Sequence, residues 1–102
     1  MSVAPPPARL RVMADYSAFP VWGDGGMIDP GDLPVPDALR ADLAAWNEEF
    51  DATWPDGWSS DAAFVAWRAV GRRLAARLQL ELGDGVVVLY WHDREQGRPL
   101  LT

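Results

Sequence analysis

Residues able to carry proton-transfer chemistry end two apolar stretches that lie far apart in the sequence. Asp15 and Tyr16 close the first stretch, and His92 and Asp93 close the second. If the two stretches form neighbouring parallel strands, their carboxyl ends meet at one sheet edge, where α/β proteins often place sites. His92 would then be a general base oriented by Asp15 or Asp93. A small enzyme that uses this edge is therefore one function that the sequence leaves open.

A simpler interpretation of the same residues is that strand ends expose polar side chains and that none of them is catalytic. Ser17 offers a hydroxyl beside Asp15, but no Gly-x-Ser-x-Gly elbow surrounds it. We favour this interpretation, so Asp15 and His92 are candidate catalytic residues only, and the enzyme class is the alternative function.

The acidic, glycine-rich segment after residue 22 matches no ligand motif. Gly23–Gly26 lacks the spacing and the lysine of a phosphate-binding loop, and its central Asp24 would repel phosphate. Asp24, Asp29 and Asp32 could ligate calcium, but their spacing does not fit an EF-hand loop. We interpret them as solvated loop carboxylates. With one histidine and no cysteine in the chain, we predict neither a catalytic metal nor a tightly bound cofactor.

The net charge of −6 is concentrated in the middle of the chain. Residues 15–61 hold eleven acidic residues and a single basic one, Arg40. A nucleic-acid-binding domain usually has the opposite balance, whereas an acidic surface speeds encounter with a basic protein. We therefore expect no nucleic-acid ligand and favour a small interaction module that binds a basic protein partner, as an immunity or inhibitor protein does. The alternative is that arginines elsewhere neutralise these acids, namely Arg68, Arg72, Arg73 and Arg77.

Six tryptophans in 102 residues are many for a small domain. Three of them, Trp46, Trp67 and Trp91, fall on predicted core faces. The others lie in or beside loops, where an exposed tryptophan commonly anchors a protein interface. The residues expected to bind the partner are therefore Trp22, Asp24, Asp29, Asp32, Trp54 and Trp58.

The apolar stretch 86–92 is the element that the rest of the chain must cover. Both of its faces are apolar and β-prone, which indicates a strand buried on two sides. Residues 9–15 alternate between apolar and polar, as in a strand with one buried face, and we predict that the two strands are parallel. Segment 16–36 has no helical period. We expect it to pack over the second face, with a short strand near residues 19–22.

Residues 37–53 and 60–82 carry apolar side chains every three or four positions, which predicts two amphipathic helices. Residues 55–57 break the pattern between them, so the helices should form an antiparallel hairpin. Gly71 lies inside the second apolar stripe at a cost of about 1 kcal/mol against alanine, so we expect another backbone to approach it closely. The residues predicted to be buried are Leu43, Trp46, Phe50, Trp67, Val70, Leu74, Leu78, Val88 and Tyr90.

These elements predict an α+β fold, a two-layer β-loop-α-α-β arrangement with the helical hairpin packed on a small sheet. The single domain spans 9–93, with a flexible arm over 1–8 and a polar tail over 94–102. No apolar run approaches the roughly 20 residues that span a membrane, and the first residues do not resemble a signal peptide. We therefore expect a cytoplasmic protein without a membrane partner. Two strands are few for a free sheet, so we also predict a homodimer, and a self-associating structural component is the third function considered.

Short motifs spread over most of the chain give one family resemblance. They are Arg11–Tyr16, Pro20–Trp22, Gly25–Gly26, Ile28–Pro30, Leu33–Pro34 and Gly71–Leu74. Together they resemble a family of small, uncharacterised proteins from GC-rich, actinobacterial-type bacteria. The resemblance implies a natural, self-contained domain and implies no activity, cofactor or functional residue.

Overall fold

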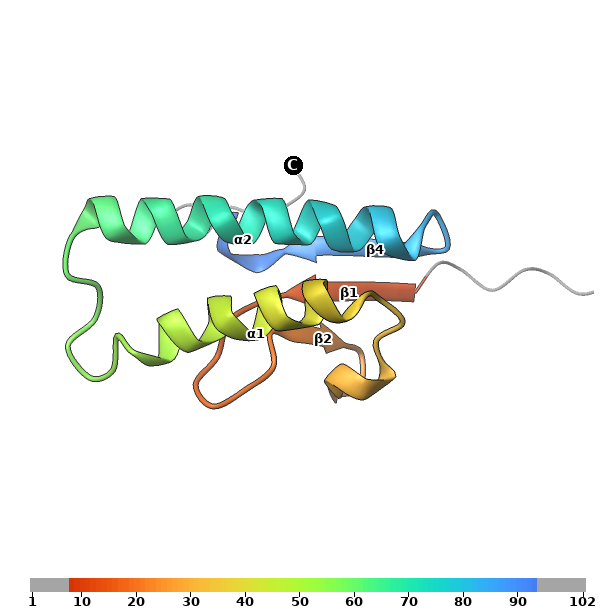
Figure 1. Ribbon diagram of the computed structural model, residues 1–102, viewed down its shortest axis with the longest axis horizontal. Coiled ribbons are helices and arrows are strands. Elements are labelled where there is room, and N and C mark those ends of the chain that lie inside the picture. Colours follow the sequence, from red (N-terminus) through yellow and green to blue (C-terminus); the bar gives the residue numbers. More distant parts are fainter. Residues whose placement is uncertain (1–7, 94–102) are drawn as a thin grey trace, which may run out of the picture.

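The computed structural model describes residues 8–93, with the side chain of Asp93 excepted. Two helices pack on a small four-stranded mixed sheet, so the predicted α+β fold is confirmed. Figure 1 shows the helices running antiparallel to each other, joined at the end of the molecule far from the start of the first strand. The predicted arm over 1–8 and tail over 94–102 lie outside the described residues, except for Ala8, which begins the first strand.

The sheet has the strand order β3-β2-β1-β4. Its strands are β1 (Ala8–Val12), β2 (Val21–Gly23), β3 (Gly26–Met27) and β4 (Val86–Tyr90). β1 and β4 are parallel, in a register that places Ala8 opposite Val86 and Val12 opposite Tyr90. β2 pairs antiparallel with both β1 and β3. The prediction that the first and last strands are parallel is confirmed, although both strands are shorter than expected.

The expectation that segment 16–36 covers the second face of the sheet is wrong. The segment instead extends the sheet, because a tight reversal pairs Gly23 with Gly26 and so joins β2 to β3. Gly26 adopts a φ of 113° there, a conformation that glycine adopts without the steric cost of a side chain.

The sheet has one face covered by the helices and one face partly open to solvent. Val12 lies on the covered face and is fully buried. Arg11 lies on the other face, opposite Trp22 and Leu89, and all three residues are half-buried. The prediction that the strand at 86–92 is buried on two sides is correct only in part, because Tyr90 of β4 is buried and residues 86–89 are half-buried.

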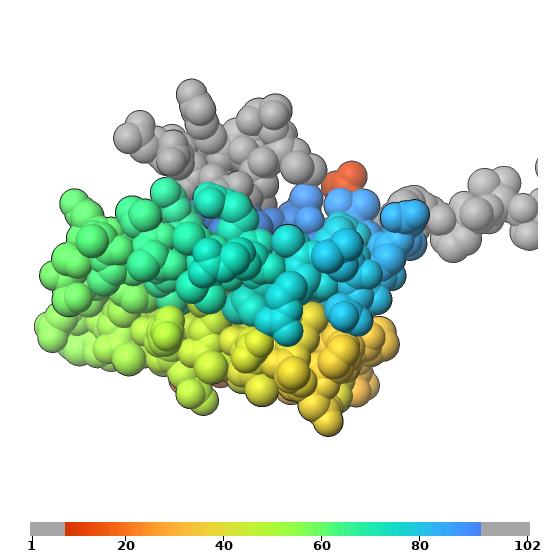
Figure 2. All heavy atoms as spheres, turned by 45° about the horizontal axis from the view of Figure 1, so that its top comes forward, coloured from red at the N-terminus to blue at the C-terminus, as the bar shows by residue number. Residues whose placement is uncertain are grey.

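The helices are α1 (Asp37–Asp51) and α2 (Asp61–Leu82), and they form the predicted hairpin. Ser60 caps α2, because its Oγ accepts the backbone N–H of Ala63 at 3.0 Å. Gly83 ends the helix with a φ of 75°. α2 contacts both α1 and β4, and Figure 2 shows the side chains of the two helices packed against each other. No helix within residues 8–93 is long and apolar enough to cross a membrane.

One hydrophobic core joins the hairpin to the sheet. Most residues predicted to be buried lie in it, namely Leu43, Trp46, Trp67, Leu74, Leu78 and Tyr90. Phe50 and Val88 are half-buried at its margin. Val70 and Trp91 are each 36% exposed, so their predicted burial is wrong. Val70 lines an open groove between the two helices, and Trp91 begins a short 3-10 helix beyond β4.

Gly71 is buried on the face of α2 that packs against the core. A Cβ atom at this position would overlap the hydroxyl of Tyr90 and the indole ring of Trp46. The expected close approach therefore exists, but the neighbours are two aromatic side chains and not a second backbone.

Gln79 of α2 covers the outer edge of β4. Its Nε2 donates to the carbonyl of Val86 at 2.7 Å, and its Oε1 accepts the N–H of Val88 at 2.9 Å. An edge strand normally leaves such groups free to pair with another chain. One side-chain amide thus takes the place of a neighbouring strand at this edge.

Candidate functional site

His92 lies just beyond β4, in the 3-10 helix η2 (Trp91–Asp93), and packs among aromatic rings. Its ring centroid is 4.8 Å from that of Trp67 and 5.7 Å from that of Trp46, edge-on to both. Its Nε2 accepts the backbone N–H of Ala14 at 2.9 Å. Desolvation by burial lowers the pKa of His92 from 6.5 to about 4. The imidazole is therefore neutral near pH 7, and its accepting nitrogen is already engaged.

The parallel strands bring Asp15 to the same end of the sheet as His92, but the two side chains have different partners. A carboxylate oxygen of Asp15 accepts the N–H of Tyr16 at 2.8 Å. The backbone N–H and carbonyl of Asp15 both pair with the buried side-chain amide of Asn47, at 3.1 and 3.0 Å. Among the described residues, no hydrogen bond joins Asp15 to His92. This geometry gives both residues structural roles and lends no support to a catalytic pair.

The three acidic loop residues all precede α1 in the sequence, in two different turns. Asp24 is exposed in the turn between β2 and β3. Asp29 caps the 3-10 helix η1 (Pro30–Asp32), where its carboxylate accepts the N–H of Gly31 at 2.9 Å. Asp32 is also exposed. In the described part of the chain, no group of three or more His, Cys, Asp or Glu residues is placed to hold a metal ion.

The three loop tryptophans differ in their exposure. Trp22 is half-buried, and its indole N–H donates to the carbonyl of Met13 at 2.8 Å. Trp58 is half-buried, with its ring centroid 5.0 Å from that of Trp67. Trp54 has 68% of its surface exposed. Of the three, Trp54 is therefore the most accessible to a partner.

The predicted binding residues do not form one continuous surface. Asp29 and Asp32 precede α1, whereas Trp54 and Trp58 follow it. α1 has 15 residues, so it separates the two groups by about 22 Å. Figure 1 shows η1 and the connection between the helices at opposite ends of the molecule. The acidic loop and Trp54 are therefore separate features.

Trp54 has neighbours that the sequence did not identify as binding residues. Tyr16 is 44% exposed, and its ring centroid lies 5.2 Å from that of Trp54 in an edge-to-face arrangement. Both rings, together with Ser17 and Asp51, line an open hollow of about 490 Å³. We name these four residues the Tyr16–Trp54 site. Tyr16 follows a strand and Trp54 follows a helix, and only the fold shows that they meet.

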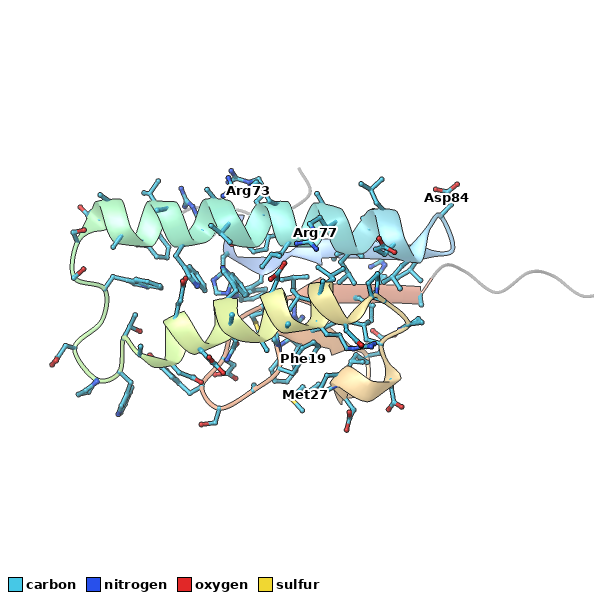
Figure 3. The ribbon with its side chains drawn as sticks, viewed as in Figure 1. Phe19, Met27, Arg73, Arg77 and Asp84 are labelled. Carbon is cyan, nitrogen blue, oxygen red and sulfur yellow. The ribbon has the colours of Figure 1, made fainter. Side chains whose placement is uncertain are left out.

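Two arginines pair with acidic residues of α1. Arg77 of α2 donates to Asp42 at 2.8 Å, and Arg40 pairs with Asp37 within α1. Figure 3 shows Arg77 over the gap between the two helices. Neutralisation by arginines of α2 thus occurs at Asp42. The other carboxylates of residues 15–61 form no ion pair with a described residue.

Comparison with known families agrees with the resemblance to small bacterial proteins and adds a family description. Comparison with curated proteins gives no match. A family model described as Serratia CdiI immunity protein-like matches residues 8–93, which include every helix and strand of the fold. Because the match extends over far more than half of the sequence, the chain belongs to the Serratia CdiI immunity protein-like family.

Proposed function

We propose that this protein is an immunity protein that binds a basic toxin protein and blocks its activity. Membership of an immunity protein-like family supports the immunity role. The acidic segment 15–61 supports a basic partner. In this proposal the complex forms in the cytoplasm, and the partner is a protein and neither a nucleic acid nor a membrane.

The observation that carries the proposal is the set of acidic side chains that lack an ion pair. Segment 15–61 has eleven acidic residues and one basic residue. Within the described residues, ion pairs engage two of these acids, Asp37 and Asp42. The remaining like charges repel one another, which lowers the stability of the isolated protein. A positively charged partner relieves this repulsion, and complementary potentials speed the encounter.

The proposal expects a toxin domain to be encoded beside the gene of this protein. The test measures binding of the purified protein to that domain, by surface plasmon resonance at low and high salt. We expect binding at low salt and an association rate that falls as salt rises, because ions screen the steering field. Co-expression with the toxin domain should also restore growth of the host cell. Absence of binding at low salt together with absence of protection contradicts the proposed function.

Charge reversal tests whether the acidic loop steers the partner. The variant Asp24→Arg with Asp32→Arg changes two exposed residues and leaves Asp29, the cap of η1, in place. We expect association to become several-fold slower. The matched control is Glu81→Arg with Asp84→Arg, which changes the net charge equally outside the acidic segment; Figure 3 shows Asp84 at the turn after α2. Equal slowing in both variants would mean that net charge, and not the loop, sets the rate.

A further inference from the structure

Helix α1 holds the Tyr16–Trp54 site in a fixed conformation. Asn47 pairs with both backbone groups of Asp15, and one helical turn later Asp51 Oδ1 accepts the N–H of Ser17 at 2.9 Å. Ser17 has a φ of 55°, which is uncommon for a residue other than glycine. Hydrogen bonds to α1 therefore hold the backbone on both sides of Tyr16. Because the turn is already in a fixed conformation, the site needs little rearrangement before it binds a partner.

Two aromatic rings of this site stay accessible to solvent. The ring centroid of Tyr16 is 4.7 Å from that of Phe50, so Tyr16 rests against the margin of the core. Within the described residues, the ring of Trp54 contacts no aromatic ring other than Tyr16. Exposed aromatic side chains beside a hollow are typical anchor points of protein interfaces.

The segments that form the site carry negative charge alone. Residues 15–17 and 48–61 contain six acidic residues and neither arginine nor lysine. One of these acids, Asp51, lines the hollow with the two rings. A cation is attracted to the face of an aromatic ring. A guanidinium group can in addition donate two parallel hydrogen bonds to a carboxylate.

We propose that the Tyr16–Trp54 site receives an arginine side chain of the toxin. The guanidinium stacks on the indole of Trp54, and Asp51 accepts its hydrogen bonds. Arginine fits the site better than lysine does, because its planar group matches both an aromatic face and a carboxylate. This inference rests on the proposed function, since it takes the partner to be a basic protein.

Three variants test the site against the same toxin domain. Trp54→Ala removes the exposed ring, and we expect it to weaken the affinity about tenfold or more. Asp51→Asn removes the charge and keeps an oxygen for the Ser17 N–H, so we expect several-fold weaker binding with a smaller salt dependence. Leu80→Ala is the matched control, because Leu80 is an apolar residue that is 83% exposed on α2. Its affinity should stay within about twofold of the wild type.

A second measurement uses peptides in place of the toxin. The indole N–H resonance of Trp54 is followed by NMR during titration with acetyl-Gly-Arg-Gly-amide and with its uncharged citrulline analogue. We expect a saturable shift with the arginine peptide, a much smaller shift with the citrulline peptide, and loss of the difference in Asp51→Asn. Equal shifts with the two peptides overturn the inference.

The two proposals fail in different ways. If the wild type binds the toxin domain and Trp54→Ala and Asp51→Asn bind it equally well, the arginine site is wrong and the immunity function stands. If the wild type neither binds the toxin domain at low salt nor protects the host cell from it, the proposed function fails, and the peptide titration still decides whether the site accepts a guanidinium group.

Discussion

The indole N–H of Trp46 donates to the backbone carbonyl of Trp67, and the indole N–H of Trp67 donates to the carbonyl of Trp46, each at 3.0 Å. The two rings are stacked, with centroids 4.4 Å apart and planes 3° from parallel. A buried indole N–H without a partner would destabilise the core. The pair satisfies both donors, and it fixes α1 against α2 at one relative position.

The first prediction concerns this reciprocal pair. Trp67→Phe keeps an aromatic ring but removes one indole donor and part of the stacked area. We expect the free energy of unfolding to fall by about 1–3 kcal/mol, measured by chemical denaturation. Trp54→Phe is the control, because Trp54 is 68% exposed, and it should change stability by less than about 0.5 kcal/mol. Equal effects of the two substitutions would show that the reciprocal bonds contribute nothing.

The second prediction reverses the usual ranking of alanine over glycine in a helix. Gly71→Ala would gain about 1 kcal/mol from helix propensity alone. Here the new methyl group would overlap the ring of Trp46 and the hydroxyl of Tyr90. We expect a net loss of about 1–3 kcal/mol from overpacking. Ala66→Gly, at an exposed position of the same helix, should lose about 1 kcal/mol and so serves as the reference. Stabilisation by Gly71→Ala would contradict the close contact.

The third prediction follows from the lowered pKa of His92. Its pKa is about 4 in the folded protein, against 6.5 for the unperturbed group. Between these values the unfolded chain binds more protons than the folded protein does, so stability rises with pH. The contribution of neutral His92 to the free energy of unfolding is fully present above about pH 6.5 and is lost as the pH falls towards 4. The free energy of unfolding changes over this range by at most about 1.4 kcal/mol per pH unit on account of His92.

Denaturation between pH 7.5 and pH 4 tests this slope against a matched variant. His92→Gln has no titrating group and offers an amide oxygen to the N–H of Ala14. We expect the variant to lose less stability than the wild type over this range. Parallel curves for the two proteins, or an NMR titration of His92 with a midpoint near 6.5, would show that burial does not lower its pKa.

The fourth prediction concerns the β4 edge and the predicted homodimer, which stays a prediction. Gln79→Leu removes the amide that pairs with Val86 and Val88. We expect the free energy of unfolding to fall by about 1–3 kcal/mol, because two partly buried backbone groups lose their partners. We also expect a larger mass by light scattering, as the uncovered edge pairs between molecules. Glu81→Leu adds an exposed leucine to the same helix without uncovering β4, so it should leave the mass unchanged. An unchanged mass for Gln79→Leu would show that β4 does not pair between molecules.

The helices, the parallel strands and most of the core could be predicted from periodicity. Helix and strand periods determine which side chains share a face, so Leu43 and Leu78 could be assigned to the core, where both are fully buried. Periodicity assigned Val70 wrongly to the core, since this residue is exposed. It lies at the flank of its stripe, where a small rotation of the helix decides between burial and exposure.

The β2–β3 hairpin and the Tyr16–Trp54 site could not be predicted. β2 has three residues and β3 has two, which is too short for an alternating pattern to be detected. The site depends on Ser17 meeting Asp51, 34 positions away, and no local pattern specifies which loop reaches which helix end. In the sequence, Asn47 looks like an ordinary polar residue on the flank of a helix. In the fold it is buried and holds the backbone of Asp15 by hydrogen bonds.

The parallel pairing of β1 with β4 joins the first and last strands of the fold, whose paired residues lie 78 positions apart. Loop closure over such a distance is entropically costly, so we expect this contact to form late in folding. During synthesis on the ribosome, β1 is made first, and the edge that pairs with β4 stays unpaired until β4 emerges. That interval exposes the nascent chain to aggregation. A chain released before Val86 would lack the strand that closes β1 and the core contacts of Tyr90 and His92, so we expect it to remain unfolded.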